Sequence, residues 1–156
     1  MCIIFSNKKK ILDLRPKIYK MVEQVFISLP PMRRGYHLVT RHIVEQLPRL
    51  PEKGLLNIFL RHTSAALAIN ENADPTVRQD FETVMDALVP DGTVQYEHNL
   101  EGEDDMPAHI KSAMFGVSLS IPIANGKLAL GTWQGIYLCE FRNGTNNRNL
   151  IATIVY

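Results

Sequence analysis

The strongest constraint on the fold lies in the last third of the chain, where apolar and small polar side chains alternate. From Val117 to Ile123 every second residue is a branched aliphatic, and the residues between them are serine or proline. This period of two is typical of a strand with one buried face. Asn125-Gly126 follow, the dipeptide that most favours a two-residue hairpin turn. Further apolar runs at 127–130, 136–142 and 150–156 predict that the chain ends in a β-meander.

Helices and strands are mixed ahead of this region. Strands are predicted over 22–29, 54–61 and 64–69, and helices over 37–47 and 107–115. Asp74-Pro75 marks the start of a further helix, because aspartate can accept hydrogen bonds from the first free N–H groups and proline suits the first turn. The order of the elements predicts an α+β fold, a single compact domain with a mixed or antiparallel sheet.

The chain of 156 residues is long enough for one domain. Residues 1–20 hold six Lys or Arg and one Asp, and we expect a basic, poorly ordered extension ahead of a domain that spans 21–156. No apolar run is long enough to cross a membrane, and the first charges follow the apolar start, the reverse of a signal peptide. The two cysteines, Cys2 and Cys139, cannot build a disulfide framework, so we expect a cytoplasmic protein with no membrane partner.

Acidic residues are concentrated between Glu71 and Asp105. This stretch has eleven carboxylates and a single Lys or Arg, Arg78, which gives a net charge of −10. Such a charge repels a phosphate backbone and argues against nucleic acid as a partner. It suits a bound cation or a cationic reaction intermediate, although a solvated acidic surface has the same composition.

Three histidines, His62, His98 and His109, stand at the ends of predicted elements or in a polar loop. Neutral imidazole together with carboxylate is a ligand set for zinc and other borderline divalent metals. Three protein ligands and one open position are typical of a catalytic site. The spacing matches no strict metal signature, so hydrogen-bonded surface histidines are the alternative. His37 and His42 are interpreted as structural.

A polar group follows the second buried strand. Asn70, Glu71 and Asp74 occupy this position, where functional residues are frequent because loops at strand ends are accessible to ligands. Helix capping and turn formation explain the same residues without a ligand.

Two further features admit both a functional and a structural interpretation. The single tryptophan, Trp133, lies between glycines and before Gln134, where it either contacts a ligand or packs at a β-bulge. Lys111, Arg142 and Arg148 are candidate phosphate anchors, because basic side chains bind oxyanions, or they are ordinary surface charges.

Several long stretches of the sequence together resemble the YjbQ-like family, whose members are often named secondary thiamine-phosphate synthase. The stretches are HTSAALAINENADPTVRQD at 62–80, EGEDDMPAHIKSAMFG at 101–116, SIPIANGKLALGTWQGIYLCEF at 120–141 and the closing strand with Arg148. The resemblance runs from about Met21 to Tyr156. Ser64 stands where the family usually has threonine, and the loop at 143–147 departs from the family pattern.

The resemblance implies a compact α+β subunit that assembles as a homotrimer. A final strand that is apolar on both faces also predicts a homo-oligomer. The resemblance further implies that the histidines bind zinc or another divalent metal and that they belong to one site together with nearby polar residues. The residues of that site are His62, Asn70, Glu71, Asp74, His98, Glu101, His109 and Lys111, with Trp133 and Gln134 nearby. Thr63, Ser64 and Arg148 complete the expected substrate-binding residues.

The activity implied by the family name joins hydroxymethylpyrimidine pyrophosphate to a thiazole phosphate and releases pyrophosphate. Zinc, or magnesium carried by the pyrophosphate, would neutralise the leaving group together with Lys111 and Arg148. Glu71 and Glu101 would stabilise the cationic pyrimidine-methyl group that the thiazole nitrogen attacks. Two alternatives stay open: a metal-dependent hydrolase of a small phosphorylated metabolite, with Glu71 or Glu101 as base, and a non-catalytic metal- or ligand-binding trimer.

Overall fold

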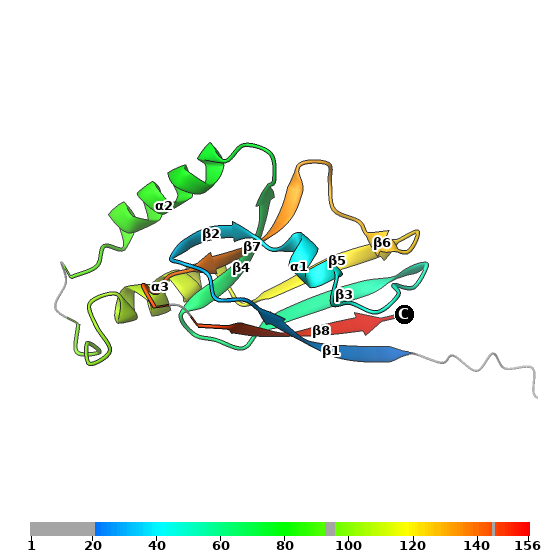
Figure 1. Ribbon diagram of the computed structural model, residues 1–156, viewed down its shortest axis with the longest axis horizontal. Helices are drawn as coiled ribbons and strands as arrows, with labels where there is room; N and C mark the ends of the chain where they lie inside the picture. The colour runs from blue at the N-terminus through cyan, green and yellow to red at the C-terminus, as the bar shows by residue number, and fades with distance from the viewer. Residues whose placement is uncertain (1–20, 93–95, 145) are drawn as a thin grey trace, which may run out of the picture.

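Two antiparallel sheets form most of the protein (Figure 1). The computed structural model describes residues 21–92, 96–144 and 146–156, so the predicted extension at 1–20 lies outside the described residues. The strand orders are β1-β8-β3-β5-β6 and β2-β7-β4. The strands are β1 (Val22–Leu29), β2 (Gly35–Leu38), β3 (Lys53–Leu60), β4 (Ala65–Glu71), β5 (Ser118–Ala124), β6 (Lys127–Leu128), β7 (Gln134–Glu140) and β8 (Arg148–Val155).

The main apolar core lies between the two sheets. It joins Ile27, Leu56 and Leu150 from the first sheet with Leu67 and Leu138 from the second, and each is at most 1% exposed. A second core lies on the other face of the second sheet, beneath α2 (Thr76–Leu88) and α3 (Asp105–Phe115). Figure 1 shows both helices beside β2, β7 and β4. The predicted α+β class is confirmed, and the sheets are antiparallel.

The predicted hairpin at Asn125-Gly126 forms between β5 and β6, and Asn125 has the positive φ of 52° that such a turn requires. The strands that follow do not continue as one meander. β7 pairs with β2 and β4, whereas β8 pairs with β1 and β3. β7 is the central strand of the second sheet and contributes residues to both cores. Its side chains are therefore buried on both faces of the sheet.

The predicted helix over 37–47 is shorter than expected. Its first residues belong to β2, where His37 pairs with Leu138 of β7, and the helix itself is α1 (Thr40–Val44). The start of α2 agrees with the sequence, since a carboxylate oxygen of Asp74 accepts hydrogen bonds from the N–H and the hydroxyl of Thr76 at 2.8 and 2.7 Å. No helix in the described segments is long and apolar enough to cross a membrane.

The first sheet has an apolar row on the face that points away from the second sheet. The strand register aligns Phe26 with Ile151, and Ile151 with Phe59. Phe26 is 72% exposed and Phe59 is 45% exposed. Contiguous exposed apolar side chains are typical of a surface that contacts another molecule.

Candidate functional site

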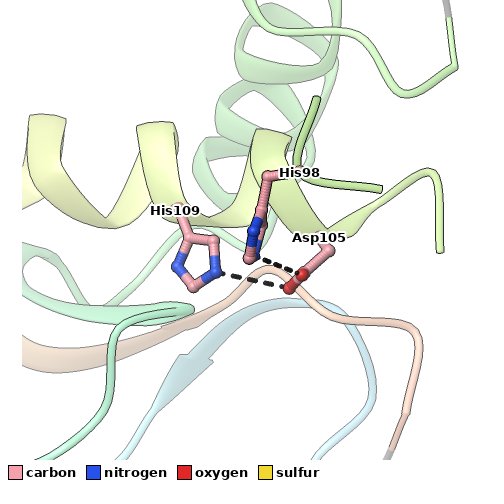
Figure 2. A group of neighbouring side chains, drawn as sticks. All are labelled: His98, Asp105 and His109. Atoms are coloured by element: carbon pink, nitrogen blue, oxygen red, sulfur yellow. Dashed lines mark ion pairs between the residues drawn. The ribbon is translucent and has the colours of Figure 1, made fainter. Parts of the chain in front are cut away.

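His98, Asp105 and His109 bring three possible metal ligands together (Figure 2). One nitrogen or oxygen atom from each residue lies within 4.8 Å of the other two. The carboxylate of Asp105 contacts both rings, with one oxygen 2.9 Å from Nε2 of His98 and the other 3.4 Å from Nε2 of His109. Asp105 and His109 are four residues apart on α3, so they share one face of the helix. His98 reaches them from the loop that precedes α3.

The tautomer of His109 leaves a free lone pair directed at this group. Its Nδ1 lies 2.9 Å from the carbonyl oxygen of Thr63. A carbonyl oxygen can only accept, so Nδ1 carries a proton and Nε2 is the nitrogen that a metal could bind. Histidine ligands of metals commonly donate the second ring N–H in this way, which fixes the orientation of the ring.

Asp105 is held in place by Arg142. The Asp105 side chain is 3% exposed, and the Arg142 guanidinium forms a hydrogen-bonded ion pair with it. The same guanidinium lies 3.3 Å from the carboxylate of Asp104 and donates to the carbonyl oxygen of Glu101 at 2.9 Å. The positive charge offsets the cost of burying the Asp105 carboxylate, because a buried charge requires a partner. Asp105 therefore presents a fixed, ionised oxygen to the two imidazoles.

These side chains line a cavity of about 370 Å³, which we call the histidine cavity. One edge of it is Arg148, whose guanidinium makes two hydrogen bonds of 2.6 Å to the buried carboxylate of Glu140. Its Nη2 also lies 3.4 Å from the hydroxyl of Ser64. The predicted site residues that line the histidine cavity are Thr63, Ser64, His98, Glu101, His109 and Arg148.

Known proteins match the chain across this whole region. The family model described as UPF0047 protein YjbQ-like matches residues 24–156. This chain belongs to the YjbQ-like family. The UPF0047 protein YjbQ of Salmonella typhimurium is 52% identical over 130 residues, which cover 82% of this chain and 94% of that protein. The protein of the same name from Escherichia coli is 50% identical over 133 residues, 84% of this chain and 96% of that protein.

Solved structures agree with this assignment. A conserved hypothetical protein from Thermus thermophilus superposes with a TM-score of 0.71 at 35% identity, and the match covers 81% of this chain and 97% of that one. A YbjQ-like protein of unknown function from Sulfolobus solfataricus gives a TM-score of 0.74 at 26% identity, over 88% and 99% of the two chains. These relatives share the fold of the YjbQ-like chain, and their names state no activity.

Within one YjbQ-like chain, His62 does not belong to the group of His98, Asp105 and His109, although it lines a neighbouring cavity of about 710 Å³ together with His109. Its Nε2 accepts a hydrogen bond of 2.8 Å from the backbone N–H of Asn149. The lone pair that a metal would need is therefore occupied. Burial, and then the nearby charge of Arg148, hold the pKa of His62 below its usual value, so the ring stays neutral. The prediction that His62 shares a metal with His98 and His109 is not met in a single chain.

Lys111 also lies away from the histidine cavity. It is 1% exposed, and its Nζ lies 2.6 Å from the carboxylate of Asp86 on α2. Two residues along a helix correspond to about 200° of rotation, which directs Lys111 away from the face that carries His109. The lysine predicted to bind phosphate instead joins α3 to α2 through an ion pair with Asp86, whose side chain is 45% exposed.

The remaining predicted residues form a second group at the opposite end of β4. Ser64 precedes β4 and Glu71 ends it, and seven extended residues span about 20 Å. In the second group Glu71 pairs with Gln134 in the strand register. Trp133 lies beside Gln134 and is 65% exposed. The members of this second group are Asn70, Glu71, Asp74, Trp133 and Gln134.

Neither Asp105 as a candidate ligand nor Arg142 as the residue that holds it was singled out from the sequence. Arg142 was considered only as a possible contact with phosphate. The helical spacing of Asp105 and His109 was the available signal, since four residues place both side chains on one face. The contact with Arg142, which is 37 residues away in sequence, had no local signal.

Proposed function

We propose that this YjbQ-like chain is a metal-dependent enzyme that acts on a small phosphorylated substrate by a reaction of the secondary thiamine-phosphate synthase type. The proposal rests on the meeting of His98, Asp105 and His109 in a cavity that also contains Arg142 and Arg148. Two imidazole nitrogens and one carboxylate oxygen fit zinc or another borderline metal. Magnesium prefers oxygen ligands, so it would arrive bound to a pyrophosphate substrate.

The metal, when bound, would neutralise oxygen atoms of the pyrophosphate leaving group. In the reaction the carbon–oxygen bond to pyrophosphate breaks and the electron pair leaves with the oxygen. The lone pair of the thiazole nitrogen forms the new carbon–nitrogen bond, and no proton is transferred. Arg148 uses Nε and Nη2 on Glu140 and Ser64, which leaves Nη1 to donate to a phosphate oxygen. The exposed carboxylate of Glu101 would stabilise the cationic carbon.

The test is formation of thiamine phosphate by the purified protein from the two phosphorylated precursors, with and without a chelator. We expect His109→Ala to lower the rate by about a hundredfold, because loss of one ligand weakens metal binding. His42→Ala, at an exposed position on α1, is the matched control and should leave the rate unchanged. A His109→Ala protein that is as active as the wild type would contradict the proposal.

One observation favours a second candidate, a metal-dependent hydrolase of a small phosphorylated metabolite. Trp133, the expected stacking partner for a heteroaromatic ring, belongs to the second group and not to the histidine cavity of the same chain. A hydrolase needs only one substrate and a base, and Glu101 lines the cavity beside His98. A panel of phosphate monoesters would separate the candidates, since release of phosphate without a thiazole acceptor supports hydrolysis alone.

We propose that the chain assembles as a homotrimer. If the protein has no catalytic activity, the remaining hypothesis is a metal- or ligand-binding trimer. The support is the exposed row of Phe26, Ile151 and Phe59 and the separation of the predicted site into two groups that one chain cannot unite. Light scattering should give three times the mass of 17.7 kDa. Phe26→Asp should lower the assembly state, whereas Val44→Asp, at an exposed position on α1, should not. A monomeric wild type would contradict the assembly.

Mixed assemblies test whether neighbouring chains share a site. If the second group of one chain completes the histidine cavity of another, inactive His109→Ala and inactive Glu71→Gln chains should regain activity after they are unfolded and refolded together. Mixtures that stay inactive would place each site within one chain.

A cytoplasmic location is part of the same proposal, because Cys139 is a free, buried thiol and such thiols persist in reducing compartments.

A further inference from the structure

A larger cavity of about 690 Å³ lies between the start of β2 and the first turns of α2. We call it the arginine cavity, because Arg33 and Arg34 line it from one side and Arg78 from the other. Its volume lies within the range of small-molecule sites, roughly 300–1,000 Å³. His98, Asp105 and His109 do not line it, so the arginine cavity is distinct from the proposed metal site.

The arginine cavity carries an excess of positive charge. Arg34 is neutralised, because it pairs with Asp86 at 2.7 Å and also with Asp91. In the described part of the chain, neither Arg33 nor Arg78 forms an ion pair within 4.0 Å. Among the lining residues, the only carboxylate is that of Glu82. Two guanidinium groups that form no ion pair with the described residues and one carboxylate therefore face the same space, and Asp74 attracts Arg78 at longer range.

Two lining residues also have buried polar atoms without partners. Nη1 of Arg78 and the hydroxyl of Tyr36 are shielded from solvent, and neither makes a hydrogen bond to the described residues. Tyr36 as a whole is 8% exposed. A charged nitrogen that has lost water without gaining a partner is costly. An anion in the adjacent cavity would lower this cost through its attraction to the guanidinium.

We propose that the arginine cavity binds the oxyanion group, phosphate or carboxylate, of a small molecule, with Arg33 and Arg78 as the charged contacts. The planar guanidinium group matches both oxyanions by paired hydrogen bonds. Asn143 also lines the cavity, and its backbone N–H donates to Asp104 at 2.8 Å. Asp104 lies beside Arg142, so the arginine cavity adjoins the residues that hold Asp105.

Calorimetric titration with inorganic phosphate, pyrophosphate and malonate tests the proposal and separates phosphate from carboxylate ligands. A chelator in the buffer and the Asp105→Asn variant exclude binding through a metal at the histidine cavity. We expect binding to persist under both conditions and to weaken about tenfold or more in Arg78→Gln, because a charge-assisted contact is lost. Arg49→Gln, which removes an exposed charge at another surface, should bind like the wild type.

Two further variants keep the test decisive if Arg78→Gln does not fold. Arg33 is exposed, so Arg33→Gln should fold normally and bind more weakly. Tyr36→Phe removes a hydroxyl that has no hydrogen-bond partner among the described residues, which leaves stability unchanged or improved when no ligand is bound. Binding by none of the three anions, or binding that Arg33→Gln and Arg78→Gln leave unchanged, would overturn the proposal. Neither result would bear on activity at the histidine cavity.

Discussion

Glu140 and Arg148 form a buried ion pair at the wall of the histidine cavity, and we expect Glu140→Gln to be strongly destabilising. The two side chains are 0% and 6% exposed, and both carboxylate oxygens lie 2.6 Å from guanidinium nitrogens. Glutamine would direct an N–H₂ group at one of these nitrogens and leave Arg148 charged without a counterion. Removing one partner of a buried pair costs about 3–5 kcal/mol. For a chain of this size that corresponds to a Tm lower by about 10 °C.

Urea unfolding at pH 7, followed by circular dichroism, measures this effect. The set consists of the wild type, Glu140→Gln, Arg148→Met and the double variant. The double variant should lose less free energy of unfolding than the two single variants added together, because it leaves no unpaired charge. Glu52→Gln, at an exposed position, is the control. A loss of less than about 1 kcal/mol in Glu140→Gln would be typical of a surface pair and would refute the reasoning.

Two further predictions concern the residues that the structure moved out of the proposed metal site. Lys111→Met should lower the free energy of unfolding by about 1 kcal/mol or less, since Asp86 is half-exposed and keeps its ion pair with Arg34, while metal content measured by mass spectrometry stays unchanged; loss of metal would return Lys111 to the site. The pKa of His62 is lowered in the folded state, mainly by burial, so the unfolded chain takes up the proton first. Stability should therefore fall as pH drops below about 6.5, and urea midpoints should fall less in His62→Gln than in the wild type. Equal falls would contradict this assignment.

Local signals were sufficient for the elements that depend on local contacts. The start of α2 follows from Asp74 and Pro75, and the β5–β6 hairpin follows from Asn125 and Gly126. The helix over 37–47 was predicted too long because the same apolar spacing is compatible with the end of a strand. Only pairing with β7, about a hundred residues later in the chain, decides that His37 is extended. Sheet membership of β7 and β8 depends on the same kind of distant pairing.

The candidate site was predictable where its residues share one element or adjoin it. His109 and Glu101 lie on or just before α3, and both line the histidine cavity. Lys111 lies outside the histidine cavity of a single chain because two positions along a helix reverse the side of α3. The contact of His62 with the backbone N–H of Asn149 carries no side-chain signal, so the sequence could not indicate it. Arg142 follows the end of β7, so its contact with Asp105 depends on the place of β7 in the second sheet.

Some carboxylates of the acidic stretch at 71–105 are paired with basic side chains of the same chain, which changes what its charge of −10 implies. Asp86 and Asp91 pair with Arg34, and Asp104 lies 3.3 Å from Arg142. Among the described residues, only Asp105 joins two imidazoles as a carboxylate ligand of such a group. Cation affinity should therefore depend on the positions of the ligands and not on the total charge.

Asp105→Asn and Glu103→Gln separate the effect of ligand position from the effect of total charge, because each removes one negative charge from the same segment. Asp105 is buried and contacts His98 and His109, whereas Glu103 is exposed. We expect Asp105→Asn to weaken zinc binding by about a hundredfold. Glu103→Gln should change it by about twofold or less, since exposed charges are screened by salt. Competition with a chromophoric chelator at 0.15 M salt, near the physiological value, gives both dissociation constants. Similar losses in the two variants would show that long-range charge, and not ligation by Asp105, holds the ion.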